Sequence, residues 1–205
     1  MKVTTKKLME FNQFQKTECR CKYCIGICSN VPGWFRPEEI VPLCEFLKMD
    51  LEAVFKKYLI LDYWIRNEEN IYILSPVKNL DRVKNLQVEL LKMVREHNHV
   101  MGRDFFDRPG SNASWSYAFI KADCIFLKND ECMIYPVRPF ECAVSDHSFK
   151  YPLNRVKISQ LRELIAEEWR KNSIIKNLLE KKRNEVSNES HCQKNTLRAG
   201  LIPLS

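Results

Sequence analysis

The sequence has no run of apolar residues that approaches the ~18 needed to cross a bilayer. Its first residues, Met1-Lys-Val-Thr-Thr-Lys-Lys, contain lysines but lack the apolar stretch that follows such lysines in a secretory signal. We therefore expect a cytoplasmic protein that has no membrane partner.

The sequence also lacks short motifs that mark several large classes of enzyme. It contains no glycine-rich phosphate-binding loop, no Gly-x-Ser-x-Gly turn that would expose a nucleophilic serine, and no His-Glu-x-x-His pair for a catalytic zinc. These absences argue against an enzyme of those classes. They leave open whether the chain is an enzyme of another kind.

A strong excess of one charge is absent as well. Lysine and arginine total 33 against 26 acidic residues, for a formal net charge of +7. The two signs are mixed along the chain, and four cysteinates around one Zn²⁺ would add a charge of about −2. We therefore expect a solvated basic surface and no specific binding of nucleic acid.

What is present fits a globular domain. Hydrophobic residues make up 45% and charged residues 29% of a 205-residue chain, which is long enough to bury a core. Hydrophobic periodicity predicts a single, mostly α-helical α+β domain over 1–186, followed by a polar, loose tail over 187–205. The expected elements are a helix after Pro37 that Pro42 kinks or delays, a helix capped by Asp50, a strand over 71–76, a helix over 80–96, a loop over 102–118, a short β-hairpin over 124–135 and a long amphipathic helix over 156–182.

The feature most informative about function is the cysteine content. The chain has nine cysteines, and four of them lie within ten residues, at 19, 21, 24 and 28. In a reducing cytosol such thiols stay reduced unless they bind a metal or perform redox chemistry. Tight spacing suits a metal better than it suits disulfides, whose geometry is demanding.

The N-terminal cluster contains the pair Cys21-x2-Cys24, with Cys28 three intervening residues later. A C-x2-C pair brings two thiolates to one ion. The spacing C-x2-C-x3-C also occurs in cluster-binding ferredoxins, which carry a further upstream cysteine and a following proline. Here Cys19 lies one residue upstream and Ser29 follows, so the match to ferredoxins is partial.

A second group of cysteines lies far along the chain, at Cys124, Cys132 and Cys142. Closing the roughly 95-residue loop between the two groups costs on the order of 4 kcal/mol of chain entropy. A structural Zn²⁺ site contributes ~10–16 kcal/mol, which exceeds that cost. The two groups therefore predict one site built from two segments, with a metal-binding core over 19–147. The alternative is that the second group consists of buried, inert thiols.

These segments together resemble a known family. Cys-x2-Cys-x3-Cys is followed by Pro32-Gly-Trp-Phe-x-Pro-Glu-Glu-Ile, by Cys124-x-Phe-Leu and by Cys132-x-Ile-Tyr-x2-Arg-Pro-x2-Cys. This order resembles the YkgJ-type cysteine-cluster family, a zinc- or iron-chelating domain with a CxxCxxCC motif, over about 19–146. The resemblance implies that six cysteines chelate the metal: Cys21, Cys24, Cys28, Cys124, Cys132 and Cys142.

One position departs from the family pattern. Ile27 stands where the motif has the first of two adjacent cysteines. Either Cys19 supplies the missing thiolate or the site has one ligand fewer. His147 is the best non-cysteine candidate, with Asp146 as its neighbour, and Arg138 is a candidate donor of N–H groups to the sulfurs or a partner in an ordinary salt bridge.

Three classes of function remain open on the sequence alone. The first is a metal-binding protein, holding zinc or an iron–sulfur cluster, that acts in electron transfer, metal handling or redox sensing. The second is an enzyme or enzyme subunit that uses the cluster, for example in protein modification. One branch of the family is related to flagellin lysine N-methylases, but no complete methyl-donor site is recognisable here. The third is an interaction module, with a protein partner, that structural zinc holds together. Six or seven candidate thiolates exceed the four of one zinc site, which favours a cluster or two ions over one structural Zn²⁺.

Overall fold

The computed structural model describes residues 22–30, 32–83, 107–114, 120–144 and 158–181, together with the single positions 88, 89, 92, 93, 96 and 117. The chain divides into two compact units, residues 1–171 and 172–205. Within the described part, no helix combines the length and the apolar character that a membrane crossing requires. The elements named below belong to the first unit unless stated otherwise.

The described part of the first unit opens with three short helical segments whose ends follow from local sequence. Helix α2 spans Lys22–Cys28, a 3-10 turn spans Pro37–Glu39, and helix α3 follows over Ile40–Leu47. Regular α-helix therefore starts only after Pro37, and Pro42 falls in its first turn, where a missing N–H is tolerated. The expected delay of the regular helix is confirmed.

Helix α4 spans Leu51–Tyr58 and begins where the sequence predicts. The Asp50 carboxylate accepts the N–H of Ala53 at 2.8 Å, which caps the helix N-terminus. Its apolar face is buried through Val54 and Phe55. The helix ends at Tyr58 because the chain continues directly into a strand.

A two-stranded antiparallel hairpin, β1 (Leu59–Arg66) and β2 (Glu69–Pro76), is the largest sheet of the described part. The turn between the strands has Asn67 and Glu68 in the left-handed region, as a two-residue hairpin turn requires. The predicted strand over 71–76 is confirmed as part of β2. Strand β1 was not predicted, because Leu59 continues the apolar spacing of α4 and the turn has no glycine.

Two smaller ladders bring the second group of cysteines next to this hairpin. Strand β3 (Lys78–Asn79) pairs with β4 (Asp123–Cys124), and β5 (Leu127–Lys128) pairs with β6 (Glu131–Cys132). Asn129 and Asp130 form the β5–β6 turn with positive φ angles, which confirms the predicted short hairpin at this turn. Cys124 pairs with β3 instead of extending that hairpin.

The segment after β3 differs from the expected helix over 80–96. Residues Leu80–Arg82 form a 3-10 turn, and Val83 is extended, so a regular helix does not begin at Leu80. The single positions described between 88 and 96 are helical, and Val88 and Met93 among them are exposed. In the expected loop over 102–118, the described residues 107–114 are irregular, with one bridge between Asn112 and Leu61.

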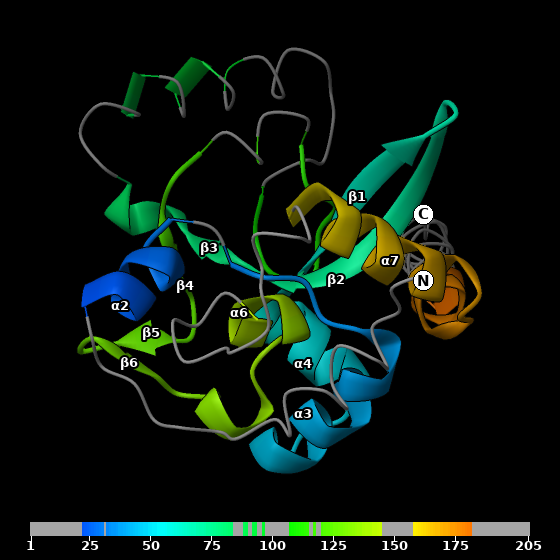
Figure 1. Cartoon of the computed structure of the whole chain (residues 1–205), viewed down its shortest axis with the longest axis horizontal. Helices are drawn as coiled ribbons and strands as arrows, with labels where there is room; N and C mark the ends of the chain where they lie inside the picture. Colours follow the sequence, from blue (N-terminus) through cyan, green and yellow to red (C-terminus); the bar gives the residue numbers. More distant parts are fainter. Residues whose placement is uncertain are drawn as a thin grey trace, which may run out of the picture. The chain divides into compact units, whose positions relative to one another are not determined.

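The C-terminal helix is shorter than expected. Helix α7 spans Ile158–Arg170, with Leu161, Ile165 and Trp169 buried, and packs against β1 and β2 (Figure 1). The predicted single helix over 156–182 is wrong, since helix resumes only at 174, in the second unit. The break arises because the Asn172 side chain accepts the N–H of Ile174 at 2.9 Å, which starts a new helix.

The core of the first unit joins the hairpin to the segment that precedes α3. Its most deeply buried residues come from β1, β2, the 32–43 segment and the 117–126 region, and include Phe35, Leu43, Ile60, Ile73, Leu74, Ile120 and Phe126. Helices and small antiparallel sheets in one core confirm the predicted α+β class. The extent of the predicted domain, 1–186, and the loose tail, 187–205, stay predictions.

The buried residue Lys78 holds strand β3 in place. Lys78 is buried; its backbone N–H donates to the Tyr117 hydroxyl at 2.7 Å, and its ammonium donates to the Tyr117 carbonyl. Burial lowers the pKa of Lys78 to about 8. Because Lys78 is the register partner of Cys124, this contact also fixes the strand that carries the cysteine.

Candidate metal centre

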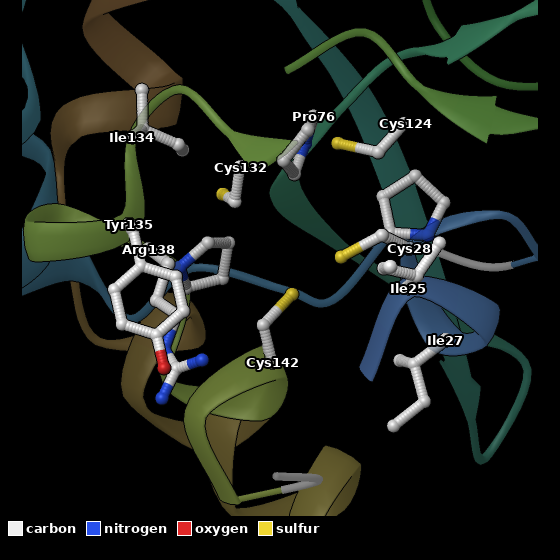
Figure 2. A pocket seen from close by; sticks show the side chains of 12 residues that line it. Ile25, Ile27, Cys28, Pro76, Cys124, Cys132, Ile134, Tyr135, Arg138 and Cys142 are labelled. Atoms are coloured by element: carbon white, nitrogen blue, oxygen red, sulfur yellow. The ribbon is translucent and has the colours of Figure 1, made fainter. Parts of the chain in front are cut away.

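Four cysteines from distant parts of the sequence line one pocket in the first unit. They are Cys28 at the end of α2, Cys124 in β4, Cys132 in β6, and Cys142 in helix α6 (Phe140–Val144). We call them the four pocket cysteines. In Figure 2 the sulfur atoms of Cys28, Cys124 and Cys142 point toward the space between the side chains, and Cys132 lies across from them. All four are free thiols.

The rest of the pocket wall is largely apolar. Isoleucines and prolines from α2, the 32–35 segment, β2 and the 134–139 turn make up most of it, and Tyr135 and Arg138 are its polar members. The cavity volume is about 40 Å³, compared with the roughly 10–15 Å³ that one water molecule needs. The space between the thiols is therefore large enough for an ion.

Backbone N–H groups near the sulfurs of Cys124 and Cys132 oppose the effect of burial on these thiols. The N–H groups of Phe126 and Leu127, two and three residues later, lower the pKa of Cys124. The N–H of Ile134, two residues later, lowers the pKa of Cys132 in the same way. Hydrogen bonds to a sulfur favour its thiolate form over its thiol form. The tight turns that follow β4 and β6 thus prepare both sulfurs for negative charge.

Cys142 receives its N–H donor from a remote segment. The N–H of Gly33 donates to the Cys142 sulfur at 3.2 Å, across 109 residues of sequence. A Cβ atom on Gly33 would lie 2.7 Å from both the backbone nitrogen and the sulfur of Cys142. Glycine is therefore needed here for close approach of two chain segments, and this explains the Pro32-Gly-Trp-Phe motif in physical terms.

The residues beside this contact reinforce it. The buried carboxylate of Glu141 accepts the N–H of Trp34 at 2.9 Å and the Arg162 guanidinium at 2.8 Å. Arg162 also lies over the Trp34 ring, 4.6 Å from its centroid. Two consecutive N–H groups, of Gly33 and Trp34, are thus bound by two consecutive side chains of α6. This double contact fixes where Cys142 enters the pocket.

The pocket is electrostatically unfavourable for uncompensated thiolates. Burial raises the pKa of Cys28 to about 11, and the Cys132 thiol adds to the rise while Arg138 opposes it. Burial likewise raises the pKa of Cys124, Cys132 and Cys142. A cation placed among the sulfurs would reverse this preference, because a coordinating thiol loses its proton.

The remaining predicted ligands lie outside what the structure describes, wholly or in part. Cys19 and Cys21 are outside the described residues, as are His147 and Asp146. Cys24 lies with Cys28 in helix α2, but the side chain of Cys24 is not described. Cys44 is half-buried in α3 and does not line the pocket.

The four pocket cysteines do not form a finished coordination sphere. Among the residues that the structure describes, no group of three or more His, Cys, Asp or Glu side chains has the arrangement of a metal-ion site. Binding one ion would require the thiols to move toward it. The full predicted ligand set, from Cys19 to Cys142, therefore stays a prediction.

Sequence reasoning missed the residues that hold the site together. Gly33, Glu141 and Arg162 act through contacts between positions that are remote in sequence, so spacing gives no signal for them. Among the aromatic residues, Trp34 and Phe35 are buried and Trp64 is half-buried, while Trp115 lies outside the described residues. Trp34 and Trp64 pack edge to face, with ring centroids 5.9 Å apart.

Glu39 connects the 3-10 turn to α6 and predicts a pH effect. Its carboxylate accepts the N–H of Arg36 at 2.7 Å and of Phe140 at 3.1 Å, and burial raises its pKa to about 7. A folded-state pKa above the unfolded value means that the stabilisation is complete below about pH 4.5 and is lost as the pH rises through 7. Between pH 5 and pH 8 the urea midpoint should therefore fall more in the wild type than in Glu39→Gln.

The control for this measurement is Glu45→Gln, which removes an exposed carboxylate of α3. It should follow the wild-type pH profile. Parallel profiles of the wild type and Glu39→Gln would contradict the assignment to Glu39. The comparison between variants cancels any pH dependence of metal binding that they share.

Comparisons of this chain with protein-family models, with curated proteins and with solved structures gave no match. The resemblance to the YkgJ-type cysteine-cluster family therefore stays an expectation that rests on the motifs quoted above.

Proposed function

We propose that this protein binds a metal through cysteine thiolates, as zinc or as an iron–sulfur cluster, in the pocket that the four pocket cysteines line. The observation that supports this function is the convergence of thiols from four separate elements, α2, β4, β6 and α6, on one cavity. Thiolates are the ligands that zinc and iron–sulfur clusters prefer. The YkgJ-type family, to which we propose that the chain belongs, carries such a centre.

The hydrogen bonds argue for ligands over inert buried thiols. A neutral buried thiol is a weak acceptor and gains little from N–H donors. Here the sulfur of Cys142 accepts the N–H of Gly33, and backbone N–H groups after Cys124 and Cys132 lower the pKa of those thiols. Donors of this kind stabilise sulfur charge in metal–thiolate centres and set their potential.

The residues of the chain have distinct tasks in this centre. The four pocket cysteines would hold the metal, and the turns after β4 and β6 orient two of them. Gly33 and Glu141 position Cys142. Loading the site releases thiol protons, since the ligands bind as thiolates. The bound group supplies either structural cross-linking of the segments or, as a cluster, one-electron chemistry.

We place the protein in the cytoplasm and assign it to electron transfer, metal handling or redox sensing. The cavity between the thiols supports this assignment. A purely structural zinc is closed off by four protein ligands, whereas a cavity leaves room for a cluster or for exchange of the metal. Cys19, Cys21 and Cys24 are proposed as further ligands of the same centre or as entry points for the metal.

Anaerobic purification followed by metal analysis tests the proposal. A cluster should give iron and acid-labile sulfide in matched amounts and a broad absorption near ~400 nm. Zinc should give a colourless protein with stoichiometric metal. Fully folded protein that contains neither metal would contradict the proposed function.

Single substitutions should then assign the ligands. Cys124→Ser and Cys132→Ser are expected to lower the metal content and the free energy of unfolding together, because serine removes one thiolate and leaves the fold's other contacts in place. Cys44→Ser, in α3 outside the pocket, is the matched control and should keep the wild-type metal content. Unchanged metal in Cys132→Ser would remove the second segment from the site.

A further inference from the structure

The positively charged side chain of Arg138 lies in the wall of the pocket that the four pocket cysteines line. Arg138 lines the pocket beside Cys132 and Cys142, and its charge acts on the thiols of Cys28 and Cys132. Figure 2 shows its guanidinium next to the Tyr135 ring, and the two are 4.1 Å apart, from guanidinium carbon to ring centroid. Arg138 thus places a positive charge in the wall of the pocket.

The chain around Arg138 restricts where that charge can lie. Tyr135–Val137 form a 3-10 turn that contains Pro136, and Arg138 is its C-cap with extended backbone angles. Pro139 follows and joins the turn to α6. The two prolines and the stacking on Tyr135 already restrict Arg138. Its side chain therefore loses less conformational entropy when it forms a contact.

We propose that Arg138 is the charge-compensating residue of the thiolate centre. Its guanidinium, held against Tyr135 in the pocket wall, offsets the negative charge that the centre gains when thiolates bind the metal, and it thereby strengthens retention of the metal. This inference rests on the proposed function and adds to it the residue that sets the affinity of the site.

The electrostatic reasoning is direct. Four thiolates around a divalent ion leave a net charge of about −2. The pocket wall is mostly apolar, so water screens this charge poorly. A guanidinium in the pocket wall lowers the free energy of the loaded state more than that of the empty, protonated state. Removing a residue in this outer position typically costs 10- to 100-fold in metal affinity.

The test is zinc affinity of the metal-free full-length protein, measured anaerobically by competition with a chromophoric chelator. Arg138→Gln should bind Zn²⁺ 10- to 100-fold more weakly than the wild type in low salt. Arg138→Lys should recover at least half of the lost affinity on a logarithmic scale, because it keeps the charge. Arg66→Gln removes an equal charge from β1, outside the pocket, and should leave the affinity unchanged.

The lysine variant separates the electrostatic role from a structural one. Salt screens a charge in an apolar pocket wall less than it screens an exposed charge, so the ratio of zinc affinities between wild type and Arg138→Gln should persist in 1 M KCl. No recovery of zinc affinity in Arg138→Lys would overturn the inference, as would equal zinc affinity of Arg138→Gln and wild type. A wild-type protein that binds no zinc would overturn it too, and the proposed function itself is contradicted only if that protein also contains no iron–sulfur cluster after anaerobic purification.

Discussion

Removal of the metal by a chelator is expected to lower the free energy of unfolding of the first unit by about 4 kcal/mol or more. A ligand present at about 1,000 times its dissociation constant stabilises the state that binds it by about 4.1 kcal/mol. The four pocket cysteines come from α2, β4, β6 and α6, so one metal would cross-link most of the chain's length. Urea titrations followed by tryptophan fluorescence, with excess metal and with chelator, measure the difference.

Cys142→Ser is the control that ties this loss to the pocket. The variant should already unfold at the lower urea concentration, and the chelator should change its midpoint little. If the wild type has the same midpoint with metal and with chelator, no metal stabilises the fold and the cross-linking role is contradicted. A large chelator effect that persists in Cys142→Ser would move the site to other ligands.

Part of the pocket lining could be predicted from the sequence, because the spacing of cysteines is a local signal. Two groups of closely spaced thiols predict one site, and the structure brings one member of the first group and three of the second to a single pocket. The β5–β6 hairpin could be predicted as well, because Asn129 and Asp130 are residue types that favour a tight turn. In each case a few neighbouring residues determine the outcome.

What the sequence could not predict depends on contacts between distant segments. Strand β1 continues an apolar pattern that suits helix as well as strand, and only pairing with β2 decides between them. The break between α7 and the helical residues from 174 onward follows from one side-chain contact at Asn172. Spacing within a segment contains no information on either contact.

The Pro32-Gly-Trp-Phe segment shows the same limit at the site itself. The motif was recognisable, but its physical reason was not. The structure explains it: Phe35 and Trp34 are buried in the core, and the Phe35 carbonyl accepts the Trp169 indole N–H at 2.6 Å. These contacts hold Gly33 against Cys142, so core packing and the position of Cys142 in the pocket depend on the same four residues.

Gly33→Ala is expected to be the most damaging small substitution in the described part of the chain. Its new methyl group would lie 2.7 Å from the backbone nitrogen and the sulfur of Cys142, and 3.0 Å from the Cβ of Glu141. Backbone atoms cannot rotate away, so α6 or the 32–35 segment must shift. Overpacking of this kind costs ~1–3 kcal/mol, and the shift also lengthens the N–H···S contact that orients Cys142.

The matched control is Gly26→Ala, on the other side of the site. Gly26 lies in α2, and a Cβ there would meet no atom within 4 Å. Alanine in a helix is favoured over glycine by ~0.5–1 kcal/mol, so this variant should be at least as stable as the wild type and keep its metal.

Gly33→Ala should instead lose both stability and metal, in parallel urea titrations and metal analyses. Wild-type metal content in Gly33→Ala would remove Cys142 from the proposed ligands. Loss of stability with retained metal would assign Gly33 to core packing alone. Loss of both, beside an unaffected Gly26→Ala, is the outcome that the close approach of Gly33 to Cys142 requires.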